Sequence, residues 1–155
     1  MTQSLHESVA ALKPALHPVY ARLLCAELQR RGYSPEQILE GLPLNWQQLH
    51  ESNQFMSFDQ MRQLIEHALK LSNCPWLGLE VGLRTPASAH GTLGAAMIAS
   101  KNLPSAMLLL QRYAGLRQNL ANLKFEHEPE FAAVLEEWVD LGPVREYLHC
   151  QLLGG

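Results

Sequence analysis

The 155-residue sequence lacks the features that mark several large classes of protein. No apolar run approaches the roughly 18–20 residues of a membrane-spanning helix. The first thirty residues carry charges and prolines where a secretory signal needs an uninterrupted apolar core. The formal net charge is −3, so no overall positive field attracts nucleic acid or an anionic membrane. We therefore expect a cytoplasmic protein without a membrane partner.

Cysteine is scarce, and the residues that support catalysis are not arranged in known motifs. Cys25, Cys74 and Cys150 are odd in number and widely separated, which favours reduced thiols over a disulfide framework. No CxxC spacing or Cys/His cluster indicates zinc. The chain also contains no GxSxG, HExxH or P-loop motif. These absences predict a protein that is not an enzyme, with no catalytic residues, no metal and no cofactor.

What the sequence does contain is a succession of helix signals. Ser34-Pro35 followed by Gln37, and Ser57 followed by Gln60, each predict a helix with a capping box at its start. Apolar periodicity and flanking Pro, Gly and Asn residues predict further helices. These cover about residues 18–31, 46–50, 75–81, 93–99 and 102–116, with a last helix from residue 142; the nearly all-apolar 93–99 helix is expected to be buried.

The pattern changes near residue 118 from helical to alternating. Residues 123–127 and 131–138 alternate in side-chain character and are joined by Glu128-Pro129-Glu130, which predicts a β-hairpin. The expected fold class is α+β, mostly α: a helical bundle followed by a small antiparallel hairpin with a helix packed on it. We expect a weakly ordered segment over residues 1–16 and one domain over residues 17–155. The early stop of an apolar final helix is typical of a fragment.

Residues 84–97, RTPASAHGTLGAAM, form the most unusual stretch of the chain. Small residues before a helix leave backbone N–H groups free to hold an anion. Arg84 could add a bidentate donor and His90 could change charge near neutral pH. A plainer alternative is that Gly91 and Gly94 permit close helix packing and that His90 is a capping or core residue.

Residues 27–51 superficially resemble a helix-turn-helix unit for DNA. Two arginines stand there against four glutamates, whereas a recognition unit needs cations to neutralise phosphates. The short helix predicted after Ser34 presents acidic and apolar residues in place of the Arg, Asn or Gln side chains that read base edges. The sequence therefore predicts a structural helical subdomain with no DNA-binding residues in this chain.

Two runs, RRGYSPEQILEGLPL and LGLEVGLRTPASAHGTLGAAMIASKNLPSAMLLLQRYAGL, carry a family resemblance. In order and spacing they resemble the N-terminal effector-binding (arabinose-binding-like) domain of AraC-type bacterial transcription regulators, from about Tyr20 to the end. Pro104 departs from the family pattern. The matching positions are Gly32, Ile38, Leu39, Gly41, Leu42, Gly78, Leu79, Gly82, Arg84, Gly91, Gly94, Leu103, Ala106, Arg112 and Tyr113.

The resemblance implies a ligand-sensing, dimerising domain that controls transcription through a C-terminal helix-turn-helix domain absent from this sequence. A small-molecule effector of unnamed class and a second copy are the expected partners, and DNA is contacted only through the other domain. From local chemistry we expect Arg84, Ser88 and His90 to anchor the effector, with Tyr113 and Trp138 as its apolar wall. The alternative is a ligand-independent oligomerisation module whose interface is the Met107, Leu110 and Ala114 stripe or the final helix.

Overall fold

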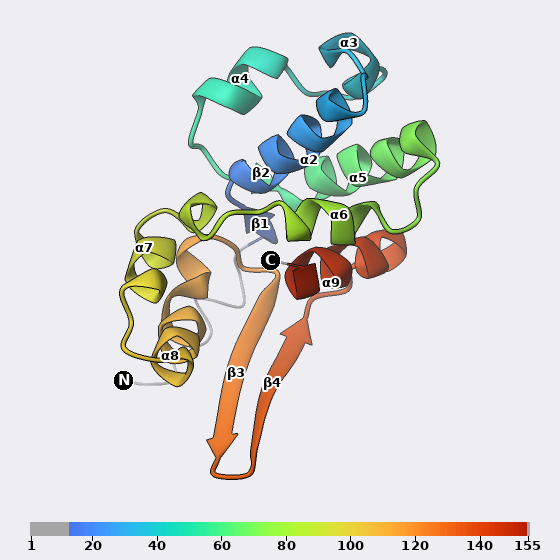
Figure 1. Ribbon diagram of the computed structural model, residues 1–155. Helices are drawn as coiled ribbons and strands as arrows, with labels where there is room; N and C mark the ends of the chain where they lie inside the picture. The colour runs from blue at the N-terminus through green and yellow to red at the C-terminus, as the bar shows by residue number, and fades with distance from the viewer. Residues whose placement is uncertain (1–12, 155) are drawn as a thin grey trace.

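The computed structural model describes residues 13–154 and confirms a mostly α, α+β architecture (Figure 1). The helices are α2 (Val19–Arg30), α3 (Pro35–Ile38), α4 (Trp46–Glu51), α5 (Phe58–Ser72), α6 (Leu77–Leu83), α7 (Thr92–Ile98), α8 (Leu103–Tyr113) and α9 (Arg145–Gly154). Short 3-10 turns are η1 (Ala87–His90), η2 (Ala114–Leu116) and η3 (Gly142–Val144). The strands are β1 (Ala15–Leu16), β2 (Met56–Ser57), β3 (Ala121–Glu128) and β4 (Phe131–Trp138).

Side-chain caps fix where the helices start. The Ser34 hydroxyl accepts from the Gln37 backbone N–H, while the Gln37 side chain accepts from the Ser34 N–H, and Ser57 and Gln60 repeat the arrangement. Both capping boxes were predicted and are confirmed. Each satisfies two of the backbone donors that a helix start leaves unpaired. Asn102 caps α8 by accepting from the Ser105 N–H.

The main core lies between α2, α5, α6 and α9. Helix α5 turns an apolar stripe inward, of which Met61, Leu64, Ile65 and Ala68 are buried. Helix α9 packs alongside α6 (Figure 1), and Tyr147 of α9 is almost fully buried. The final helix is thus an integral part of the core and not a free surface.

Close packing of α6 on α9 depends on Gly78. A Cβ atom at Gly78 would lie 2.2 Å from the carbonyl oxygen of Tyr147. Gly94 has a similar role in α7, where a Cβ would lie 1.8 Å from the carbonyl oxygen of Ala87. The short distance at Gly94 supports the alternative that this glycine permits close helix packing.

Helix α7 forms where residues 93–99 predicted it, but the prediction that it is buried was wrong. Leu93 and Gly94 are buried, whereas the Ile98 side chain is 68% exposed. The helix is short and packs through one face on η1 and α8. Its outer face therefore has no covering element among the described residues, despite its apolar sequence.

A two-residue sheet, which the sequence did not predict, ties the start of the described chain to the body. Ala15 and Leu16 of β1 pair with Ser57 and Met56 of β2. The Asn119 side chain reinforces this edge, because its Oδ1 accepts from the Ala15 N–H at 2.6 Å and its Nδ2 donates to the Lys13 carbonyl at 3.1 Å. Residues 1–12, most of the segment expected to be weakly ordered, lie outside the described residues.

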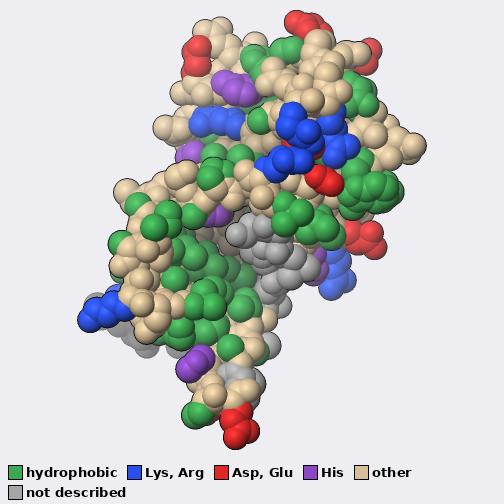
Figure 2. Space-filling view, in the orientation of Figure 1, with side chains coloured by type: hydrophobic (Ala, Val, Ile, Leu, Met, Phe, Trp, Pro, Cys, Tyr) green, Lys and Arg blue, Asp and Glu red, His purple; other side chains and the backbone are tan. Residues whose placement is uncertain are grey.

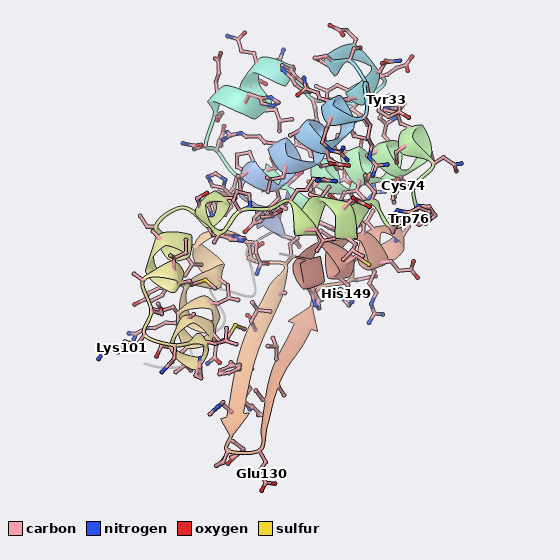
Figure 3. All side chains as sticks on the ribbon, viewed as in Figure 1. Tyr33, Cys74, Trp76, Lys101, Glu130 and His149 are labelled. Atoms are coloured by element: carbon pink, nitrogen blue, oxygen red, sulfur yellow. The ribbon has the colours of Figure 1, made fainter. Side chains whose placement is uncertain are left out.

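The predicted hairpin is confirmed. Strands β3 and β4 pair in antiparallel register from Ala121 with Trp138 at the base to Glu128 with Phe131 at the turn. The hairpin projects away from the helices (Figure 1), with Glu130 at its tip (Figure 3). Its base borders the cavity described below, and farther along β3 the Phe125 N–H donates to the Gln111 side chain of α8 at 2.6 Å. Among the described helices, none combines the length and apolar character needed to cross a membrane.

Candidate functional site

A cavity of about 130 Å³ lies where the helical lobe, the α7–α8 pair and the base of the hairpin meet. Apolar side chains dominate its wall, and a few polar groups converge on it, as is usual for small-molecule sites. The lining residues are Leu16, Tyr20, Thr85, His90, Leu93, Leu110, Ala114, Arg117, Gln118, Leu120, Ala121, Leu123, Trp138, Leu148 and Gln151. Figure 2 shows hydrophobic side chains gathered over α7, α8 and the adjoining part of the hairpin.

The backbone around Arg117 is anchored by the first strand. The Arg117 carbonyl accepts from the His17 N–H at 2.8 Å, and Leu16 bridges to Gln118. The Gln118 Oε1 accepts from the N–H groups of Leu120 and Ala121, at 2.5 and 2.8 Å. The segment that joins η2 to β3 is therefore held on both sides, and it carries Arg117 to the cavity wall.

Arg117 is the cationic side chain of the cavity. Its Nη2 donates to the Ala89 carbonyl at 2.9 Å, but its Nε is buried and has no hydrogen-bond partner. Within residues 13–154, Arg117 forms no ion pair. The described lining contains no Asp or Glu, so no carboxylate among these residues neutralises this cation, and a polar side chain close to it in the cavity is that of Tyr20.

The other titratable groups of the cavity are a paired tyrosine and histidine. Tyr20 Oη lies 3.3 Å from His90 Nδ1. Burial, and then the charge of Arg117, lower the pKa of His90 below its ordinary value of 6.5. Burial raises the pKa of Tyr20, with Arg117 acting in the opposite direction. Both groups are therefore neutral near pH 7, and Arg117 supplies the positive charge of the cavity.

Two of the five predicted site residues reach the cavity. His90 lines it from η1, and Trp138 lines it from the end of β4. The Trp138 ring also lies 5.1 Å from that of His149 on α9, which Figure 3 places beside the base of the hairpin. The cavity thus brings together His90 and Trp138, which are 48 positions apart in the sequence.

The other three predicted residues lie elsewhere. The Arg84 side chain is 52% exposed and pairs with Glu27 at 3.2 Å and with Glu80 at 3.5 Å. Ser88 is exposed on η1 and is not a lining residue. The Tyr113 side chain is exposed and also does not line the cavity. The Arg112 guanidinium lies 5.4 Å from the centre of the Tyr113 ring. The cavity thus does not unite the five residues.

Arg84 instead belongs to a charge cluster around the buried carboxylate of Glu27. Arg30 donates to both oxygens of Glu27, at 2.9 and 2.7 Å, and Arg31 donates at 2.8 Å. These hydrogen bonds hold the pKa of Glu27 near 2, against an ordinary 4.5, although burial acts in the opposite direction. Figure 2 shows the basic side chains gathered over α2.

Sequence reasoning missed Arg117, Tyr20 and Gln151. Arg117 stands between η2 and the first strand of the hairpin, and a single cation in such a place is a weak signal. Tyr20 and Gln151 lie on helix faces that periodicity assigns to the core. Two residues of the predicted interface stripe lie at the cavity, since Leu110 and Ala114 line it and Ala114 is buried; an interface at this stripe stays a prediction.

No group of His, Cys, Asp or Glu in the described part of the chain is arranged to hold a metal ion. The three cysteines are free thiols. Burial raises the pKa of Cys25 to about 12, so this thiol is protonated and unreactive at neutral pH.

Comparison with known proteins agrees with the resemblance found in the sequence. Residues 32–155 match the family described as the arabinose-binding domain of AraC transcription regulators, N-terminal. The chain is also 33% identical over 94 residues to the ornithine utilization regulator of Pseudomonas aeruginosa. That alignment covers 61% of this chain and 28% of the relative, so the chain corresponds to about a quarter of that regulator. The chain therefore belongs to the family of N-terminal arabinose-binding domains of AraC transcription regulators.

Proposed function

We propose that this domain senses a small-molecule effector, which binds in the cavity bordered by Arg117, Tyr20, His90 and Trp138. One observation carries the proposal: the cavity is apolar, has a few convergent polar groups, and is formed jointly by the start of α2, the α7–α8 region, the hairpin base and α9. A molecule in it contacts the helical lobe, the α7–α8 pair and the hairpin together. Regulation then follows from linkage, because an effector that prefers one arrangement of these parts favours it by its difference in affinity.

The full regulator acts, in this proposal, on DNA in the bacterial cytoplasm through a separate DNA-binding domain. The relative from Pseudomonas aeruginosa is named for ornithine utilization. L-Ornithine is therefore one compound to test, together with other amino acids, sugars, carboxylic acids and cyclic nucleotides. Thermal unfolding and isothermal titration calorimetry of the isolated chain measure binding directly, since a ligand of the folded state raises the melting temperature.

Filling the cavity is expected to abolish binding while leaving the fold intact. Ala114 lines the cavity, and Ala114→Leu adds three carbon atoms that occupy it. The free energy of unfolding is expected to change by no more than about 1–3 kcal/mol, since the new side chain enters existing space. The measurement is calorimetric titration with any compound that the panel identifies.

Ala106→Leu is the matched control. Ala106 is also a buried alanine, 8% exposed against 7% for Ala114, but it does not line the cavity. This variant is expected to keep wild-type affinity. If both variants bind equally well, the ligand sits elsewhere; if the panel yields no ligand for the wild type, effector sensing by this cavity is not supported.

A second function, ligand-independent oligomerisation, is favoured by exposed apolar side chains on the α7–α8 side. The exposed fractions are 68% for Ile98, 72% for Leu103, 54% for Leu108 and 65% for Leu116. Contiguous exposed apolar surface often marks a protein interface. Sedimentation velocity over a hundredfold concentration range tests this function. A dimer that Leu108→Glu dissociates, and that no ligand affects, would support it.

A further inference from the structure

The most specific feature of the cavity is a buried guanidinium donor with nothing to bind. Arg117 Nε is buried without a hydrogen-bond partner, although the same side chain donates from Nη2 to the Ala89 carbonyl. A buried unpaired donor costs free energy, and more so when the group is charged. That cost is recovered when an acceptor of opposite charge enters the cavity.

The surroundings of Arg117 contain no internal acceptor of that kind. The described lining residues include no carboxylate, and Tyr20 and His90 bind each other. Gln151 provides a second buried donor at the wall, because its Nε2 also has no hydrogen-bond partner. Arg117 Nε, which can only donate and carries the guanidinium charge, is therefore the unpartnered buried atom that selects for the ligand's sign, and it matches an anion better than a cation.

The size of the cavity limits what accompanies the anion. Its volume of about 130 Å³ is close to the 150 Å³ of an engineered apolar cavity that binds benzene. The cavity therefore accommodates an apolar body of about six carbon atoms. Leu93, Leu110, Leu123 and Leu148 offer apolar contacts to that body, and no described carboxylate lines the wall to pair with a ligand ammonium group.

We propose that the effector is a small monocarboxylate with an apolar body of about six carbons, whose carboxylate pairs with Arg117 while the body fills the leucine-lined cavity. This inference rests on the proposed function, since it specifies the ligand class of the same site. It also separates this chain from a sensor of diamino acids, because the described lining residues include no acid to bind their ammonium groups.

The test compares matched probes on the chain itself by isothermal titration calorimetry and thermal unfolding. Hexanoate and benzoate carry the carboxylate, hexanamide has the same body without the charge, and L-ornithine carries the carboxylate with two ammonium groups. Hexanoate or benzoate is expected to bind roughly ten- to hundredfold more tightly than hexanamide, since the amide keeps a carbonyl acceptor for Arg117 but lacks the negative charge that strengthens the bond. L-Ornithine is expected to bind more weakly than hexanoate.

Arg117→Met removes the charge and retains much of the apolar side chain. This variant is expected to bind hexanoate at least tenfold more weakly than the wild type does, and to bind hexanamide with unchanged affinity. The ligand-free variant is expected to melt no lower than the wild type, because removal of the buried, unpartnered Nε offsets the loss of the Nη2 bond to Ala89; a purely structural role for Arg117 predicts lower melting instead. Arg117→Lys keeps the charge and tests the proposal if Arg117→Met does not fold. Arg112→Met, at an exposed cation outside the cavity, is the control and is expected to bind hexanoate as the wild type does.

The outcomes separate the two proposals. Equal binding of hexanoate and hexanamide, or unchanged hexanoate binding by Arg117→Met, overturns the carboxylate assignment while effector sensing stands. Tighter binding of L-ornithine than of hexanoate also overturns it. If no compound of the wider panel binds the wild type, the result counts against both the carboxylate assignment and effector sensing.

Discussion

Gly78→Ala is expected to lower the free energy of unfolding by about 3 kcal/mol or more. The new Cβ would lie 2.2 Å from the carbonyl oxygen of Tyr147 and 2.9 Å from its carbonyl carbon. Both are backbone atoms of α9, so a change of rotamer cannot relieve the contact, and α6 and α9 must separate. Chemical denaturation followed by circular dichroism measures the loss.

The matched control for Gly78→Ala is Gly115→Ala. No atom lies within 4 Å of a Cβ built at Gly115, so this alanine is expected to be neutral or to stabilise by about 0.4–1 kcal/mol, because it restricts the unfolded chain. Helix α9 also carries Leu148 and Gln151 to the cavity. Gly78→Ala should therefore weaken binding of any cavity ligand as well. An unchanged unfolding midpoint would contradict the close α6–α9 contact.

Glu27→Gln is expected to cost about 2 to 3 kcal/mol of stability at pH 7. The carboxylate is 2% exposed and accepts three hydrogen bonds from Arg30 and Arg31, with Arg84 Nε 3.2 Å away. Glutamine retains the size but loses the charge, and it cannot accept on both ends of its amide. The arginines remain partly solvated, which keeps the loss below that of a fully buried pair.

The pKa of Glu27 determines how the stability difference between the wild type and Glu27→Gln depends on pH. It is about 2 in the folded chain and 4.5 without partners, so the unfolded chain binds the proton more readily. The stabilisation is complete above pH 4.5 and disappears as the pH falls towards 2. Denaturation of wild type and variant across this range is expected to show two curves that converge in acid.

Glu66→Gln serves as the control for the Glu27 substitution. Glu66 also accepts a 2.8 Å bond from an arginine, Arg62, but both side chains are about one-third exposed. An exposed pair contributes only about 0–1 kcal/mol. A Glu27→Gln loss no larger than that of Glu66→Gln would show that burial of the carboxylate does not strengthen its ion pairs.

Local features of the fold could be predicted because their causes lie within a few residues. The Ser34 and Ser57 capping boxes each use two side chains three positions apart. The hairpin follows from alternation on both sides of a short turn. The β1–β2 sheet has two pairs of residues, which is too short to leave any periodic pattern. Burial of α7 was overestimated because composition does not reveal which neighbours cover a helix.

The site was harder to predict because its residues meet only through tertiary packing. His90 is brought to Tyr20, 70 positions earlier, and Arg117 reaches the Ala89 carbonyl across 28 positions. His90 was singled out from an unusual stretch and Trp138 as a scarce aromatic, and both line the cavity. Arg84, from that same stretch, turns away from the cavity and joins Arg30 and Arg31 around the buried carboxylate of Glu27 on α2.

A small rotation of the hairpin at its root produces a large displacement at its tip. Ala121, Leu123 and Trp138 at its root touch the cavity, and its eight paired positions lead from there to a tip that extends beyond the helices. Such a ribbon is about 25 Å long, so a tilt of about 10° at the root swings the tip by about 4 Å. A probe molecule that shifts the root by less than the width of an atom would thus produce, at Glu130, a displacement large enough to follow with a pair of spin labels.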